Sequence, residues 1–200
     1  SRIRSLISIC KKVFDMKTVI LLIDFKGHPA LGGEYLNNRR YAEVQKILTD
    51  TQIDRSKIIF AVSKGNKDVK LEELKFMAKH LDIKYYEYDS HITFEDLQKQ
   101  LLQHHNFLMG TDNTQIIIGG TNTAGCVIKS SKPMNAINSY IKGYATTIYL
   151  PMCAEYEQPG INDIERTMVS LVDVYKWIKK YGAYKIKLET NYTELNLPKK

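Results

Sequence analysis

Runs of adjacent apolar residues are the feature that most restricts the fold of this chain. The clearest run spans residues 17–24 and reads Lys-Thr-Val-Ile-Leu-Leu-Ile-Asp. A strand with one solvent-exposed face alternates apolar and polar residues, whereas a run this continuous indicates a strand buried on both faces. Segments with helical spacing of apolar residues separate the runs. This alternation predicts an α/β fold, a three-layer, six-stranded and mostly parallel sheet with helices on both faces.

The expected elements follow from these patterns along the chain. Thr93 and Asp96 have the spacing of a capping box at the start of one helix. No repeat or linker divides the 200 residues, so we expect a single domain over 1–200 that begins with an amphipathic helix at 1–16. Strands are predicted at 17–24, 57–63, 83–88, 116–119, 145–150 and 184–188, and further helices at 35–50, 69–81, 94–105, 127–142 and 161–181. In the last helix, the stripe expected to face the sheet comprises Met168, Leu171, Val172, Tyr175 and Ile178.

Charge and cysteine content narrow the class of protein. The net charge is +7, but the lysines are spread along the chain, which favours solvated positions over a nucleic-acid site. The amino-acid sequence gives no sign of stacking aromatics, a recognition helix or a zinc module, any of which would support nucleic-acid binding. No apolar run is long enough for a membrane helix, and the three cysteines form no CxxC pair. We therefore expect a cytoplasmic protein without a membrane partner, a disulfide framework or a zinc site.

Two polar residues follow strands of the predicted sheet. Asp24 ends strand 17–24, and Cys126 comes after the Gly-rich turn that follows strand 116–119. The carboxyl ends of parallel strands meet at one edge, where ligands of open α/β sheets bind. Cys126 would open helix 127–142, whose dipole favours the reactive thiolate; a buried structural cysteine is the alternative interpretation. The pair predicts nucleophilic chemistry in which Asp24 deprotonates the Cys126 thiol.

Other groups are expected at the same edge of the sheet. The N–H groups of Gly125 and Cys126 are placed to form an oxyanion hole. Phe25, His28 and His91 fall beside strand ends and are candidates to contact a small-molecule substrate.

The stretch Gly120-Thr-Asn-Thr-Ala-Gly-Cys-Val resembles the nucleophile turn of the isochorismatase-like cysteine hydrolases, which has the pattern Gly-x-x-Thr-x-x-Cys-Val. The run that ends at Asp24, with the Pro-Ala-Leu-Gly-Gly segment after it, is similar to the first strand and loop of that family. The resemblance covers most of the chain. It implies a nucleophilic Cys126, a general base at Asp24, and a cis peptide between Thr121 and Asn122 that shapes the oxyanion hole. It also implies a tendency to form homo-oligomers.

The sequence departs from the family pattern in three respects. The family has a catalytic lysine at the end of the third strand, where this chain has Tyr88 and Asp89. Lys84 is the candidate for that role, with Lys64 as the substitute. The metal-binding Asp and His cluster of the nicotinamidases is missing after the second strand, so we expect neither a metal nor another cofactor. The family's long substrate loops are replaced by helix 69–81.

Two functions follow from these observations. The first is a metal-independent cysteine hydrolase of a small amide or carbonyl compound, which forms a covalent acyl-enzyme on Cys126. A thiol of low pKa there would be alkylated faster than Cys10 and Cys153. The second function, motivated by the unplaced lysine, is a catalytically degenerate protein of the same fold that binds a ligand or a protein partner. A nucleic-acid binder is a third idea that rests on positive charge alone.

Overall fold

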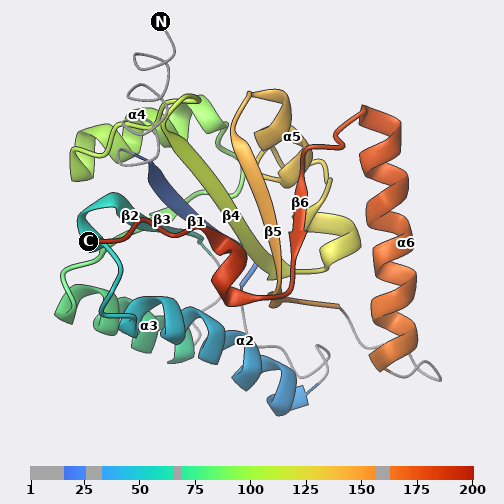
Figure 1. Cartoon of the computed structure of the whole chain (residues 1–200), viewed down its shortest axis with the longest axis horizontal. Helices are drawn as coiled ribbons and strands as arrows, with labels where there is room; N and C mark the ends of the chain where they lie inside the picture. Colours follow the sequence, from blue (N-terminus) through green and yellow to red (C-terminus); the bar gives the residue numbers. More distant parts are fainter. Residues whose placement is uncertain (1–15, 26–32, 65–68, 156–162) are drawn as a thin grey trace, which may run out of the picture.

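The apolar runs form the central strands of a parallel sheet (Figure 1). The computed structural model describes residues 16–25, 33–64, 69–155 and 163–200. Six strands pair in the order β3-β2-β1-β4-β5-β6, and every pair is parallel, which confirms the predicted fold class. The helix predicted at 1–16 lies outside the described residues. The strands are β1 Lys17–Ile23, β2 Ile58–Ser63, β3 Lys84–Tyr88, β4 Thr114–Thr121, β5 Ala145–Ala154 and β6 Lys187–Glu189.

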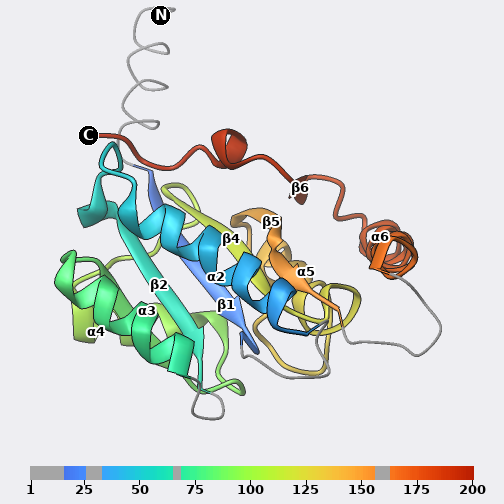
Figure 2. The same ribbon diagram turned by 90° about the horizontal axis from the view of Figure 1, so that it is seen from below.

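Helices cover both faces of the sheet (Figure 1 and Figure 2). On one face, α2 and α3 bury Val44 and Leu74, and on the other α4, α5 and α6 bury Leu97, Ile137 and Val174. The helices are α2 Gly33–Thr49, α3 Val69–His80, α4 Phe94–His105, α5 Ala136–Ile141 and α6 Asp163–Tyr181, with the short turns η1 Arg55–Lys57, η2 Thr123–Val127 and η3 Tyr192–Leu195. None of the helices in the described ranges combines the length and the apolar content needed to cross a bilayer.

Alternate residues of the central strands enter two apolar cores, one on each face of the sheet. In β1, Val19, Leu21 and Ile23 join the core under α4, α5 and α6, while Ile20 and Leu22 join the core under α2 and α3. All five side chains are at most 2% exposed. This double burial is the reason that the run has no polar alternation.

The order of the strands places a switch in chain direction between β1 and β4. From β1 the chain adds β2 and β3 on one side, and then returns to place β4 on the other side of β1. In open α/β sheets the ligand crevice lies beyond the carboxyl ends of the strands at such a switch. Asp24 follows β1 and the turn η2 follows β4, so both stand at this point.

Two glycines lie inside β4 and not in the turn after it. A Cβ on Gly120 would lie 2.1 Å from the carbonyl oxygen of Ile23, and a Cβ on Gly119 would lie 2.5 Å from the Cβ of Met152. The glycines therefore let β4 approach β1 on one side and β5 on the other. The Gly-rich turn expected directly after residue 119 is therefore replaced by strand, and the glycines serve close contact between strands.

The helix predicted at 127–142 is largely absent. Thr123–Val127 forms a single π-helical turn, η2, and no regular helix follows until α5 begins at Ala136. Pro133 lacks an N–H donor and disfavours helical backbone at the residue before it, so a continuous helix cannot pass through this position. Cys126 consequently lies within the π turn and not at a helix N-terminus.

The buried face of α6 differs from the predicted stripe. Val174 and Ile178 are buried, whereas Met168, Val172 and Tyr175 are 53% to 62% exposed. Apolar residues occur on more than one side of this helix, so their spacing alone could not select the buried side.

Other predicted bounds are close to those observed. Helix α4 begins and ends where predicted, and Thr93 and Asp96 form the expected capping box. Strand β5 continues through Pro151 to Ala154, further than predicted, and β6 is confined to Lys187–Glu189.

The C-terminal tail crosses the amino-terminal edge of the sheet. Lys199 pairs with Ile53 in an isolated antiparallel bridge, and the Gln115 amide donates to the Asn196 carbonyl at 2.9 Å. Leu197 is buried in the core under α2 and α3. The tail is therefore fixed at the edge opposite to Asp24.

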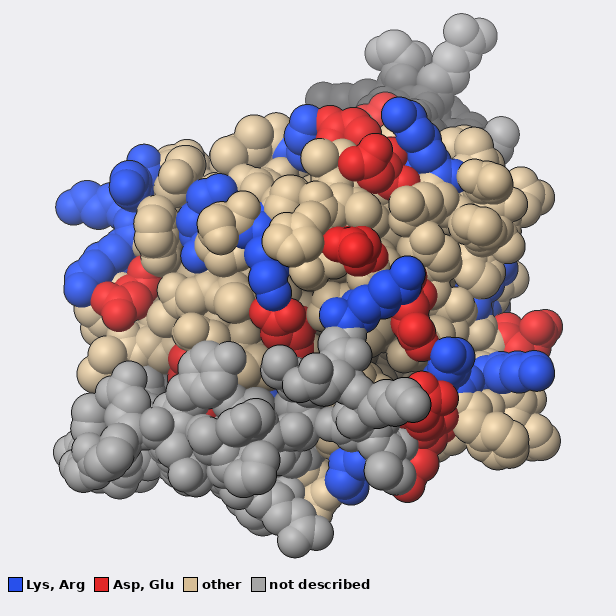
Figure 3. All heavy atoms as spheres, turned by 180° about the vertical axis from the view of Figure 1, so that it is seen from behind, with Lys and Arg blue, Asp and Glu red and all other residues tan. Residues whose placement is uncertain are grey.

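Surface charge is mixed over much of the face shown in Figure 3, where basic and acidic side chains are interspersed. Basic side chains gather at the border of this face that lies over α6, at the upper left. On that helix Lys176, Lys179 and Lys180 are all exposed.

We expect Gly120→Ala to lower the free energy of unfolding by about 3 kcal/mol, because the added Cβ would force β1 and β4 apart. Urea denaturation followed by circular dichroism measures this loss. Gly182→Ala is the matched control, since a Cβ there meets no atom within 4 Å and only the left-handed backbone, with φ of +62°, opposes it. The control should cost about 1 kcal/mol. Equal losses in the two variants would show that close approach does not constrain β4.

Candidate active site

The carboxylate of Asp24 is held at the carboxyl end of β1 by an ion pair. Lys132 Nζ lies 2.9 Å from each of the two carboxylate oxygens. The backbone N–H of Asp24 donates to Ser63 Oγ, at the end of β2, over 2.8 Å. Asp24 has a left-handed backbone with φ of +46°, a conformation that Asp adopts more readily than most residues. Asp24 is thus held through its side chain by Lys132 and through its backbone by β2.

The thiol of Cys126 meets this carboxylate. Cys126 is partly buried, and the Asp24 carboxylate lies near enough to act on its thiol. Burial and the negative charge of Asp24 raise the pKa of the Cys126 thiol, while Lys132 and the residue's own N–H lower it. The net direction is upward, so the expected low-pKa thiolate is wrong. The sulfur needs a base to become a nucleophile, and Asp24 is in contact with it.

The loop between η2 and α5 positions Lys132. The Asn135 side chain donates to the Lys132 carbonyl over 2.8 Å, and the Asn138 side chain donates to the Pro133 carbonyl over 2.8 Å. Asn135 also caps α5 by accepting from the Asn138 N–H. Lys132 was not among the residues predicted for the site, because the sequence pattern placed it on a helix. The Lys-Pro pair was the available signal, since a residue before Pro disfavours helical backbone.

The turn that carries Cys126 is anchored to the end of β5. The N–H of Asn122 donates to the Ala154 carbonyl over 2.6 Å, and the N–H of Thr123 donates to Glu155 Oε1 over 2.7 Å. The Ser170 hydroxyl of α6 donates to the same carboxylate oxygen. Glu155 therefore joins the turn η2 to β5 and α6, a role that nothing in the sequence pattern indicated.

A second support lies behind the turn, on the α2 side of the sheet. Arg40, which is 1% exposed, donates to Thr121 Oγ1 over 3.3 Å. Its guanidinium also lies 4.3 Å from the centroid of the Phe25 ring, which packs edge-on against Tyr41. Phe25 is fully buried in this packing. The expectation that Phe25 contacts substrate is therefore wrong, because its ring belongs to the core.

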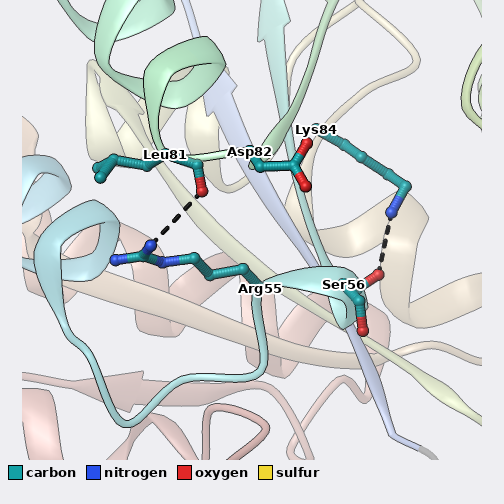
Figure 4. A pocket seen from close by; sticks show the side chains of 5 residues that line it. All are labelled: Arg55, Ser56, Leu81, Asp82 and Lys84. Atoms are coloured by element: carbon teal, nitrogen blue, oxygen red, sulfur yellow. Dashed lines mark hydrogen bonds between the residues drawn. The ribbon is translucent and has the colours of Figure 1, made fainter.

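The predicted lysine, Lys84, lies at the wrong edge of the sheet. Its Nζ donates to the Ser56 carbonyl over 3.1 Å, at the amino-terminal ends of β2 and β3 (Figure 4). There it lines a pocket of about 380 Å³ together with Arg55, Ser56, Leu81 and Asp82. Arg55 donates to the Leu48 and Leu81 carbonyls near the ends of α2 and α3. This pocket is a structural junction between helix ends and is remote from Cys126.

The substitute, Lys64, stands at the correct edge but does not complete the site. Its backbone N–H donates to the Tyr88 carbonyl, and its side chain is exposed. Lys132 engages the Asp24 carboxylate instead. His91 has an exposed side chain, and its N–H donates to Asp89 Oδ1. His28 lies outside the described residues.

The oxyanion turn differs from the geometry that the resemblance implied. Peptide bonds of the described residues are all trans, so the bond between Thr121 and Asn122 is not cis. Asn122 instead has a left-handed backbone with φ of +62°, which redirects the chain into η2. The N–H of Gly125 donates to the Asn122 carbonyl over 3.0 Å and is not free to bind an oxyanion. The N–H of Cys126 remains the candidate donor.

The arrangement joins a thiol, a carboxylate and an ammonium group, the components of a nucleophile and its base. Within the ranges that the structure describes, no three His, Cys, Asp or Glu side chains gather as a set of metal ligands.

We expect Asp24→Asn to lower the pKa of the Cys126 thiol, because the variant lacks the negative charge that disfavours the thiolate. The pH dependence of iodoacetamide labelling, followed by mass spectrometry, measures the change. Cys153 is an internal slow reference, since burial raises the pKa of its thiol to about 12. Asp82→Asn, at the remote pocket, should leave the Cys126 pKa unchanged. A Cys126 pKa that stays the same or rises in Asp24→Asn would contradict the contact.

We expect Glu155→Ala to reduce the free energy of unfolding by about 2 kcal/mol, because the Thr123 N–H loses its acceptor. Glu155→Gln retains a side-chain oxygen that can accept from the same N–H, and it should lose at most about 1 kcal/mol. Thermal unfolding of the two variants separates the outcomes. If Glu155→Gln lowers the free energy of unfolding as much as Glu155→Ala does, the hydrogen bond to the Thr123 N–H is not the stabilising contribution of Glu155.

Comparisons with known proteins give little further information. No protein-family model matches the chain, and no curated protein matches it. A solved structure, that of MAR1 ribonuclease from Caenorhabditis elegans, is similar over 92% of this chain and 82% of its own, with a TM-score of 0.48 and 10% sequence identity. A likeness this low does not establish a common family.

Proposed function

We propose that this protein is a cysteine hydrolase of the isochorismatase-like type, which acts on a small amide or related carbonyl compound without a metal. The observation that carries the proposal is the meeting of the Cys126 thiol, the Asp24 carboxylate and the Lys132 ammonium at the carboxyl ends of β1 and β4. These groups come from three separate segments of the chain. A position at the strand switch is where an open α/β sheet binds its ligand.

In the first step, Asp24 accepts the thiol proton while the sulfur of Cys126 attacks the substrate carbonyl carbon. The oxygen of the tetrahedral intermediate takes a hydrogen bond from the Cys126 N–H. The carbon–nitrogen bond then breaks, and the protonated Asp24 returns its proton to the departing nitrogen. The products are a free amine and an acyl thioester on Cys126.

In the second step, Asp24 removes a proton from water as the water oxygen attacks the thioester carbonyl. The carbon–sulfur bond breaks, the carboxylic acid leaves, and the proton returns to the sulfur. Lys132 holds the carboxylate by both oxygens, which fixes the base in one orientation. Its positive charge also lowers the pKa of the Cys126 thiol and so assists the attack.

One observation favours a second function, that of a binding protein with a degenerate active site. The pKa of the Cys126 thiol is raised overall, and Lys132 already engages both oxygens of the base. A site in this state resembles a stable polar cluster more than an activated nucleophile. The two functions differ in turnover and in covalent labelling of Cys126.

We expect Cys126→Ala to abolish hydrolysis of the active members of a panel of small primary amides, a loss of at least about a thousandfold in kcat/KM. Cys153→Ala is the matched control and should retain turnover, because the Cys153 thiol is buried in β5, where it donates to the Tyr149 carbonyl. Mass spectrometry of a rapidly quenched reaction should show an acyl adduct on Cys126 alone. If the native protein hydrolyses no amide and iodoacetamide labels Cys126 no faster than Cys153, the binding function replaces the enzymatic one.

A further inference from the structure

A groove lies between the turn η2 and the C-terminal half of α6. Its volume is about 320 Å³, and it is lined by Ala124, Asp173, Lys176, Trp177 and Lys180. This volume lies at the lower end of the range for pockets that bind small ligands, roughly 300 to 1,000 Å³. Ala124 belongs to the turn that carries Cys126, but the other four residues come from α6 and take no part in the Cys126 site, so the groove needs a separate explanation.

Aromatic rings line and flank the groove. Trp177, the single tryptophan of the chain, stacks on Tyr181 with ring centroids 5.9 Å apart and an interplanar angle of 26°. Lys180 Nζ lies 4.9 Å from the Trp177 centroid, and Lys129 Nζ lies 5.8 Å from the Tyr181 centroid. Tyr181 is 38% exposed. The aromatic pair therefore reaches the surface, with Trp177 partly buried against the core and Tyr181 exposed, and ammonium groups border it.

Positive charge exceeds negative charge around these rings. Lys176, Lys179 and Lys180 are exposed on the last turns of α6, and basic side chains gather over this part of the molecule in Figure 3. Asp173 pairs with Lys176 over 2.8 Å and offsets one charge. Lys176 and Lys180 are spaced i, i+4, so their like charges oppose each other in the free protein. The helix dipole accounts for lysines in the last turn, but it does not account for the rings beside them.

We propose that this groove binds single-stranded nucleic acid, with a base stacked against Trp177 and phosphates held by Lys176 and Lys180. Proteins that bind single strands without strong sequence preference combine a basic groove with aromatic rings on which bases stack. The sequence pattern argues against such a partner, because no stacking aromatics are evident in it. The structure supplies them, since α6 brings Trp177 and Tyr181 together among its lysines.

The test uses the intact chain and a short fluorescein-labelled oligouridine, with binding followed by anisotropy. The unlabelled oligomer should also quench the fluorescence of Trp177, which reports on the groove alone because the chain has no other tryptophan. Lys176→Gln combined with Lys180→Gln should weaken binding about tenfold or more at low salt. Loss of two phosphate contacts should reduce the slope of log affinity against log salt by about 1.4.

The control removes the same charge elsewhere. Lys79→Gln combined with Lys99→Gln, at exposed positions of α3 and α4, should change affinity by far less than the α6 pair. Tyr181→Leu tests the ring separately and should weaken the oligomer about tenfold while leaving the salt slope unchanged. Equal weakening by the two lysine pairs, no quenching of Trp177, or tighter binding to vesicles of anionic lipid than to the oligomer would each overturn the proposal.

Discussion

The close approach of β4 to its two neighbours is the constraint on which the rest of this structure depends. Gly120 allows the strand to pass the Ile23 carbonyl, and Gly119 allows it to pass Met152. With any larger side chain at Gly120, β4 could not lie in register beside β1 up to its last residue. That register is what brings the residue after β1 and the turn after β4 to one place. The Gly-Gly pair thus determines the geometry of the site through the backbone, without contributing a functional group to it.

Electrostatics at the site favour a thiol that stays protonated until its base acts. The Asp24 carboxylate opposes the thiolate, and the Lys132 ammonium favours it, so the two neighbours act on the Cys126 sulfur in opposite directions. Such an arrangement protects the sulfur from adventitious oxidation, because the thiolate is the form that reacts. It also makes reactivity depend on proton transfer to a defined acceptor. The thiol and its base therefore have to be considered as a pair.

Much of the fold could be predicted from the sequence, because each central strand is buried on both faces and shows this in its composition. The convergence of Asp24 and Cys126 followed from the rule that parallel strands end at one edge. Lys132 was missed because the helical spacing around it was given more weight than Pro133. The prediction of the buried face of α6 was wrong because α6 carries apolar residues on more than one of its sides. Only tertiary packing could select the side that is buried. The anchoring by Glu155 depends on contacts between distant segments, which no local pattern records.

The position of β1 at the centre of the sheet also has a consequence for synthesis on the ribosome. β1 pairs with β2 on one edge and with β4 on the other, and β4 is synthesised well after β2. Until then, the hydrogen-bonding groups along that edge stay open, beside some of the most apolar residues of the chain. An open apolar edge is a template for pairing with other chains. A chain synthesised only as far as β3 lacks β4, so its exposed apolar edge would favour aggregation until β4 is added.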